Sequence, residues 1–99
     1  MISLSDATKN RVASLFPSED DRSEVCRYFE LECGDNLPMI DADYVELAER
    51  IRFAVLKLSQ GRIPHLKDLT DGAKVDWRDT LMMAGFAEYV KAHLAWNLV

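Results

Sequence analysis

Few residues of this chain are of types that do chemistry, and their spacing matches no common reaction centre. The 99 residues include two cysteines, Cys26 and Cys33, and two histidines, His65 and His93. The sequence contains no His-Glu-x-x-His, Gly-rich phosphate-loop or Gly-x-Ser-x-Gly pattern. We therefore expect no catalytic, cofactor-binding or metal-binding residues.

The two cysteines are interpreted as core residues. Seven positions separate Cys26 from Cys33, which is two helical turns, so both lie on one face about 10 Å apart. A disulfide needs Cα atoms closer than about 7 Å, and zinc ligands usually have two to four residues between them. Free thiols packed in a core are typical of a reducing compartment, so we expect a cytoplasmic protein.

The two histidines are expected to have structural roles. His65 follows Pro64 at a predicted helix start, where a surface or capping position is expected. His93 lies one turn after Tyr89 and just before Trp96. It belongs either to a packed C-terminal helix or to an aromatic pocket that contains a titratable group.

Charge is distributed unevenly along the chain. Residues 19–49 hold eleven acidic and two basic side chains, a net charge of −9, whereas residues 50–99 carry +3 and the whole chain −5. This balance, with no run of Lys or Arg, argues against nucleic-acid binding. The acidic stretch is either a solvated face or a surface for a basic partner. Its candidate partner-binding carboxylates are Glu30, Glu32, Asp35, Glu46 and Glu49.

The apolar spacing predicts an all-α fold in one domain, residues 1–99, with five or six short helices around a central helix at 43–60. No alternating strand pattern is evident, and the longest apolar run, 81–87, is far shorter than the about twenty residues of a membrane-spanning helix. The predicted helices span 5–16, 18–34, 43–60, 64–72, 76–85 and 86–97.

Capping residues set these boundaries. Predicted N-caps are Ser5, Ser18, Asp41 or Asp43, and Asp76, and predicted terminators are Gly34, Gly61, Asp71-Gly72 and Gly85. After Gly85 the apolar positions move to the opposite helix face, which indicates a break and a separate last helix. One long helix between two packing partners is the alternative.

Four apolar residues are further candidates for partner binding. Phe53 points away from the apolar stripe of the central helix, so either another helix covers it or it anchors a partner; we favour the intramolecular contact. Met82 and Met83 are adjacent and cannot both face one core, and Trp96 lies at the end of the last predicted helix.

Two motifs resemble a class of short, uncharacterised bacterial helical proteins. They are Leu56-Lys57-Leu58-Ser59-x-Gly61 and Val75-Asp76-Trp77-Arg78-Asp79-x-Leu81 with Ala84, and the resemblance covers about residues 47–86. It implies a bacterial all-helical protein and carries no known activity or site. In that class an acidic residue usually follows the glycine, whereas this chain has Arg62 and then Pro64.

The sequence favours a small, non-enzymatic bacterial protein-interaction module that binds a protein partner or a second copy of itself, with no nucleic acid, membrane or cofactor involved. One alternative is an acidic inhibitor, similar to an antitoxin, that neutralises a basic effector. A third is an enzyme that combines carboxylates such as Glu30, Asp41 and Asp43 with His65 or His93, although no mechanism orders these groups.

Overall fold

The computed structural model describes residues 1–96 and contains, within them, four α-helices and one 3-10 turn. The helices are α1 (Asp6–Leu15), α2 (Glu19–Glu32), α3 (Val45–Ser59) and α4 (Ile63–Ala84), and the 3-10 turn is η1 (Ala92–Ala95). The all-α prediction is confirmed, because no strand occurs in the described residues, but the prediction of five or six helices is wrong.

Two serines begin the first two helices as predicted. The Ser5 hydroxyl accepts a hydrogen bond from the backbone N–H of Thr8, and the Ser18 hydroxyl accepts one from that of Asp21. The end of α2 differs from the prediction. Gly34 does not adopt a left-handed conformation; instead Cys33 leaves helical geometry, with φ −136° and ψ 68°.

The central helix is shorter than predicted and has no side-chain cap. Asp41 is occupied in a turn, where its carboxylate accepts from the backbone N–H of Asp43, and Tyr44 is the N-cap. Neither aspartate therefore caps α3, so that prediction is wrong. At the other end, Gln60 and Gly61 both have positive φ, of 54° and 76°, and they terminate the helix.

Helix α4 continues through the predicted break at Asp71-Gly72. Thr70 and Ala73 are both fully buried, so packing on the core holds this turn helical despite the glycine. The chain leaves helical geometry at Asp76, with φ −156° and ψ 94°, and the Asp76 carboxylate accepts from the backbone N–H of Arg78. Asp76 therefore does act as a local cap, but it marks a kink inside α4. Gly85, with φ 81°, ends the helix as predicted.

The chain after Gly85 does not form the predicted helix at 86–97. Residues 86–91 are irregular and only η1 follows, while residue 97 lies outside the described part of the chain. Arg50 of α3 holds this irregular segment in place, since its guanidinium donates to the carbonyls of Phe86 and Tyr89 at 3.3 and 3.1 Å. The Tyr89 carbonyl also accepts from the backbone N–H of Ala92 at the start of η1.

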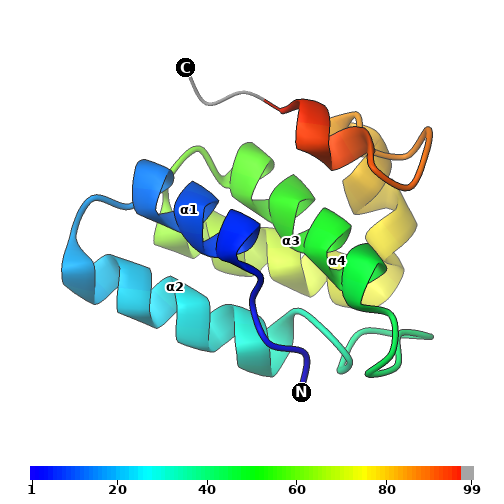
Figure 1. The fold of residues 1–99 in the computed structure, drawn as a ribbon, viewed down its shortest axis with the longest axis horizontal. Helices are drawn as coiled ribbons and strands as arrows, with labels where there is room; N and C mark the ends of the chain where they lie inside the picture. The colour runs from blue at the N-terminus through cyan, green and yellow to red at the C-terminus, as the bar shows by residue number, and fades with distance from the viewer. Residues whose placement is uncertain (97–99) are drawn as a thin grey trace.

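Helix α3 lies at the centre of the molecule. It contacts α4 on one side and α1 and η1 on the other, while α2 packs against α1 and α4 (Figure 1). Six consecutive residues of α3, 51–56, are buried. Figure 1 also shows the kink in α4, whose first segment runs behind α3 and whose second segment turns upward at the right. Within residues 1–96, no helix has both the length and the apolar character needed to cross a membrane.

Candidate functional site

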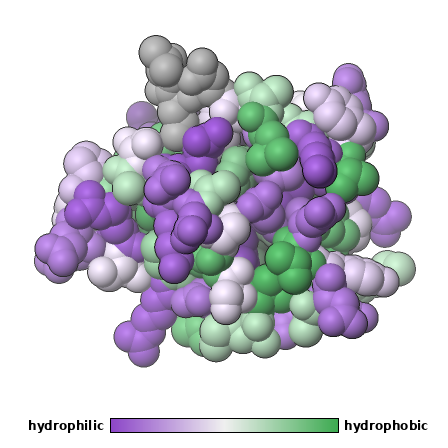
Figure 2. Space-filling model, in the orientation of Figure 1, coloured by the Kyte–Doolittle hydropathy of each residue, from purple (hydrophilic) through white to green (hydrophobic). Residues whose placement is uncertain are grey.

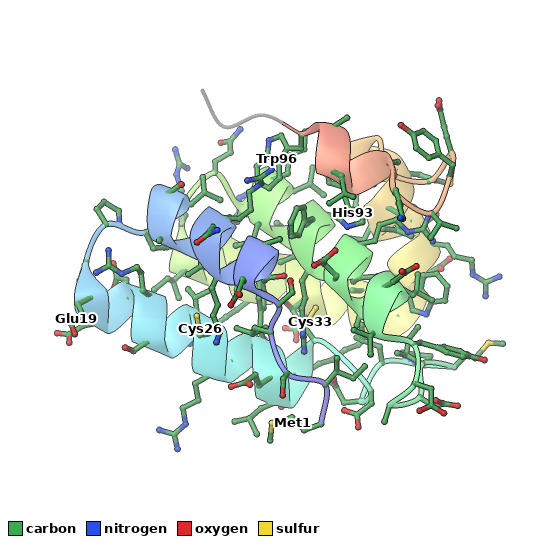
Figure 3. The ribbon with its side chains drawn as sticks, in the orientation of Figure 1. Met1, Glu19, Cys26, Cys33, His93 and Trp96 are labelled. Carbon is green, nitrogen blue, oxygen red and sulfur yellow. The ribbon has the colours of Figure 1, made fainter. Side chains whose placement is uncertain are left out.

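The side chains with the most reactive chemistry are used inside the fold. Glu49 of α3 accepts a hydrogen bond from the Ser5 hydroxyl on one oxygen and lies 2.8 Å from Nε2 of His93 on the other. His93 is 2 % exposed and points from η1 toward α3 (Figure 3). Because an ionised carboxylate only accepts, Nε2 of His93 carries the proton in this bond.

The order of these three groups differs from that of a nucleophile–base pair. Glu49 stands between Ser5 and His93, so the serine proton goes to a carboxylate and the imidazole cannot receive it. Burial raises the pKa of Glu49, but the hydrogen bonds from Ser5 and His93 and the attraction of charged neighbours outweigh it, so that the pKa is lowered. The arrangement stabilises an ionised carboxylate that joins α1, α3 and η1.

Arg52, which sequence reasoning missed, is the largest fully buried side chain among the described residues, at 1 % exposure. Its guanidinium donates to four main-chain carbonyls, those of Ile2, Ser3, Phe29 and Cys33, at 2.6 to 3.3 Å. Burial lowers the pKa of Arg52. The guanidinium therefore donates to carbonyls at the end of α2, where the helix dipole favours a cation.

The two cysteines lie on the inner side of α2, as Figure 3 shows, and both are free thiols. Cys33 is fully buried and Cys26 is half-buried. Burial raises the pKa of Cys33 to about 12, and it also raises that of Cys26, with help from the nearby carboxylate of Glu30. Neither thiol is activated as a nucleophile, in agreement with the core-packing interpretation.

Several of the predicted acidic candidates are paired within the fold. Glu32 lies 2.6 Å from the ammonium of Lys74, and Asp35 lies 2.9 Å from the N-terminal amine of Met1. Glu30 is half-buried and Glu46 is exposed at the start of α3. Within the described residues, no group of three His, Cys, Asp or Glu side chains is arranged to hold a metal ion.

Phe53 is fully buried, so the intramolecular contact that we favoured is the one observed. Its ring packs edge-on against His93 at 4.7 Å between centroids and against Trp96 at 6.0 Å. The guanidinium of Arg11 from α1 lies 5.3 Å above the Phe53 ring and donates to the carbonyl of Trp96. Phe53 and the half-buried Trp96 therefore hold η1 against α3, and the Phe53 side chain is covered within the fold.

Both methionines of the candidate set are exposed, Met82 at 66 % and Met83 at 63 %, and they line different grooves. Met82 belongs to a groove of about 300 Å³ with Trp77, Leu81 and Ala87. A second groove, of about 550 Å³, is lined by Tyr44, Val45, Leu47 and Val90. Arg50 lines both grooves, and we call the two together the Arg50 surface.

The Arg50 surface combines the start of α3, the irregular segment 86–91 and the second segment of α4. Hydrophilic residues cover most of the left half of Figure 2, and hydrophobic groups occur mainly in its right half, where these elements lie. Sequence reasoning found only Met82 and Glu46 of this surface. The sequence places Tyr44 and Val45 on the central helix and its flank. No local pattern reveals that residues 86–91 are irregular and contribute to the same surface.

Met83 lines a third groove, of about 570 Å³, all of whose lining residues belong to α4. We call it the α4 groove; His65, Asp68, Gly72, Val75, Asp79 and Met83 lie along it. Sequence reasoning missed it because Asp71-Gly72 was interpreted as a helix end. The spacing of three or four residues from His65 to Met83 is the signal that predicts one shared helix face.

Comparisons with models of protein families, with curated proteins and with solved structures found no significant match for this chain. The resemblance of its two motifs to short bacterial helical proteins therefore stays a prediction.

Proposed function

We propose that this protein is a small bacterial interaction module of the cytoplasm that works as a homodimer, with the Arg50 surface as the contact between its two copies. The observation that carries the proposal is the pair of adjoining apolar grooves that share Arg50. The cytoplasmic location rests on the two free thiols and the bacterial origin on the motif resemblance.

The apolar content of this surface supports a protein contact. Met82 is 66 % exposed, Val90 55 % and Val45 52 %, and Tyr44 lies beside them. Large apolar side chains that are exposed next to one another are typical of protein interfaces, in which aromatic residues, Met and Arg are enriched. Since the described residues, 1–96, leave these side chains exposed, a second protein surface is a natural partner for them.

The distribution of charge favours a second copy as that partner. Asp43 and Glu46 line the groove at the start of α3, whereas Arg78 lines the groove on α4. In a two-fold symmetric pair, each patch contacts the other patch of its partner. The acidic end of one copy would then face the basic end of the other, and the two apolar grooves would meet face to face.

The test is the mass in solution across a concentration series, measured by light scattering. We expect a dimer for the natural sequence and a monomer for Met82→Asp, because a carboxylate placed among the apolar side chains of the contact is costly to desolvate. Met83→Asp is the matched control: it places the same charge at the neighbouring exposed position, outside the Arg50 surface, and should remain dimeric.

A charge exchange makes the test specific to the proposed geometry. Glu46→Arg alone and Arg78→Glu alone should each weaken the dimer, and the double variant should recover at least part of the loss. A natural sequence that stays monomeric at every concentration would refute the proposal, as would a Met82→Asp variant that dimerises as well as its control.

A further inference from the structure

We propose that the α4 groove binds a basic amphipathic helix of a second protein. The groove is separate from the Arg50 surface, so this inference does not depend on self-association. It differs from the Arg50 surface in its charge, which has one sign, and in its shape, which follows a single helix.

The groove is long and continuous. Its lining residues run from His65 to Met83 at spacings of three or four, so they form one face across both segments of α4. The kink at Asp76 and the missing side chain at Gly72 account for its hollow shape. A partner helix in this groove would lie against both segments of α4.

Gly72 is the first independent observation. It lies in the interior of α4, its φ is not positive, and a Cβ added to it would meet no atom within 4 Å. Glycine destabilises a helix interior relative to alanine, and here neither backbone geometry nor packing in the fold requires it. A partner that approaches the backbone closely would require it, because only glycine leaves the middle of the groove open.

The second observation is an unusual exposure of apolar side chains. Val75 is 85 % exposed, the highest value among the large hydrophobic residues of the described chain, and Met83 is 63 % exposed. They lie on either side of the kink on the same face. The groove therefore offers apolar contacts on both segments of α4, as a helix-binding groove does.

The third observation is the charge of the lining. Asp68, Asp76 and Asp79 line the groove, and no Lys or Arg does. Asp76 lies 3.8 Å from the guanidinium of Arg78, whereas no ion pair within the described residues involves Asp68 or Asp79. Because these carboxylates are not arranged to hold a metal ion, the complementary ligand is a row of Lys or Arg side chains beside an apolar stripe.

The test uses a labelled synthetic peptide of eighteen residues, with leucines on one helix face and lysines beside them. Its affinity is measured by fluorescence anisotropy and its helicity by circular dichroism. We expect it to gain helicity on binding, and its affinity to fall at least tenfold for Gly72→Leu, which fills the hollow. The Asp68→Asn, Asp79→Asn double variant should bind at least fivefold more weakly.

The matched control for charge is Glu19→Gln with Asp20→Asn, an exposed pair at the start of α2 that loses the same charge. It should bind the peptide like the natural sequence. Equal losses in both double variants would show only general attraction to an acidic protein and would overturn the proposal. So would an unchanged affinity of Gly72→Leu.

Two stability and mass measurements complete the test. Gly72→Ala should raise the melting temperature, since the methyl group meets open space. A fall would show that the fold itself needs this glycine and would overturn the proposal. Gly72→Leu should keep the oligomeric state of the natural sequence. A loss of dimers in that variant would assign the groove to self-association and refute the foreign partner.

Discussion

Glu49 and His93 are joined by a hydrogen bond of 2.8 Å between Oε2 and Nε2, which fixes η1 to the middle of the fold. The other oxygen of the same carboxylate accepts from Ser5 at the start of α1. One carboxylate of α3 therefore fastens segments from both ends of the chain. Its contribution to stability depends on its ionisation, which makes it testable with pH.

The first prediction concerns acid. The folded state lowers the pKa of Glu49, so the unfolded chain binds more protons in acid. The stabilisation from Glu49 is therefore fully present above its unfolded pKa of about 4.3. It is lost as the pH falls through the lower pKa of the folded state. We expect the free energy of unfolding, measured by urea denaturation from about pH 7 down to about pH 3, to decrease as the pH is lowered below about 4.3.

Glu49→Gln tests the assignment of that acid dependence. It should cost about 1.5–3 kcal/mol at neutral pH, where the ionised acceptor is lost, and flatten the pH dependence. Asp35, whose pKa is lowered by its hydrogen bond with the N-terminal amine, should leave a residual slope. The exposed Glu46→Gln should change neither quantity; an equal flattening there would contradict the assignment.

The second prediction concerns Arg52. Arg52→Met retains the volume of the stem but leaves four carbonyls of the N-terminal arm and the end of α2 without their donor. The Phe29 carbonyl keeps its hydrogen bond from the backbone N–H of Cys33, but each buried group left unsatisfied costs about 1–3 kcal/mol, so we expect a loss of about 3 kcal/mol or more. Arg52→Lys should recover only part of it, because an ammonium lacks the planar fork.

Equilibrium denaturation of these variants gives the measurement. Arg27→Met, on the exposed side of α2, is the control, and its effect should be within about 0.5 kcal/mol of zero. A loss at Arg52 no larger than this would show that water replaces the guanidinium without cost.

The third prediction couples Gly34 to Arg52. A Cβ at Gly34 would lie 2.9 Å from Nη2 of Arg52, which is held in place by main-chain carbonyls. Gly34→Ala should therefore destabilise the protein by about 1–3 kcal/mol through overpacking. In the Arg52→Met background the same change should cost less. A double-mutant cycle measures the difference, and strict additivity would disprove the steric explanation.

The fourth prediction concerns thiol reactivity. Burial raises the pKa of Cys33 to about 12 and raises that of the half-buried Cys26 less. Because the thiolate is the reactive form, iodoacetamide should modify native Cys26 slowly and Cys33 only after unfolding. Mass spectrometry of the peptides separates the two sites. Rapid labelling of native Cys33 would mean that the end of α2 opens far more often than its hydrogen bonds imply.

The sequence predicts several local features of this fold, although the expected terminator Gly34 and the expected caps Asp41 and Asp43 are not among them. The serine caps of α1 and α2 and the left-handed Gly85 follow from rules that act within one turn. The turn at Gly72 was predicted incorrectly because burial of Thr70 and Ala73 against the core outweighs the local preference of glycine. Tertiary contacts also act on residues 86–91, which are irregular where a helix is predicted and in which Arg50 binds two carbonyls.

The candidate sites were harder to predict than the fold. Glu49 is a partner-binding candidate in the sequence because its contacts with Ser5 and His93, each 44 positions away, cannot be seen there. Phe53 is expected to be covered within the fold, but the sequence does not reveal that His93 covers it. Arg52 lies among apolar residues of the central helix in the sequence. A charged residue in such a run indicates a buried side chain with hydrogen-bond partners, so its role could have been predicted. The Arg50 surface could not be inferred, since it joins three segments whose proximity only the folded chain reveals.

The contacts of α3 with the two ends of the chain also set an order of assembly. Arg52 reaches Ile2 across 50 positions, and Glu49 reaches Ser5 and His93 across 44 positions each. Helices α3 and α4 are neighbours in sequence, so their pairing has a small entropic cost of loop closure. The contacts of Arg52 and Glu49 with the two ends of the chain close much longer loops. We therefore expect the helical pair to form early and both ends to dock late, so that native-state hydrogen exchange is faster at η1 than in α3.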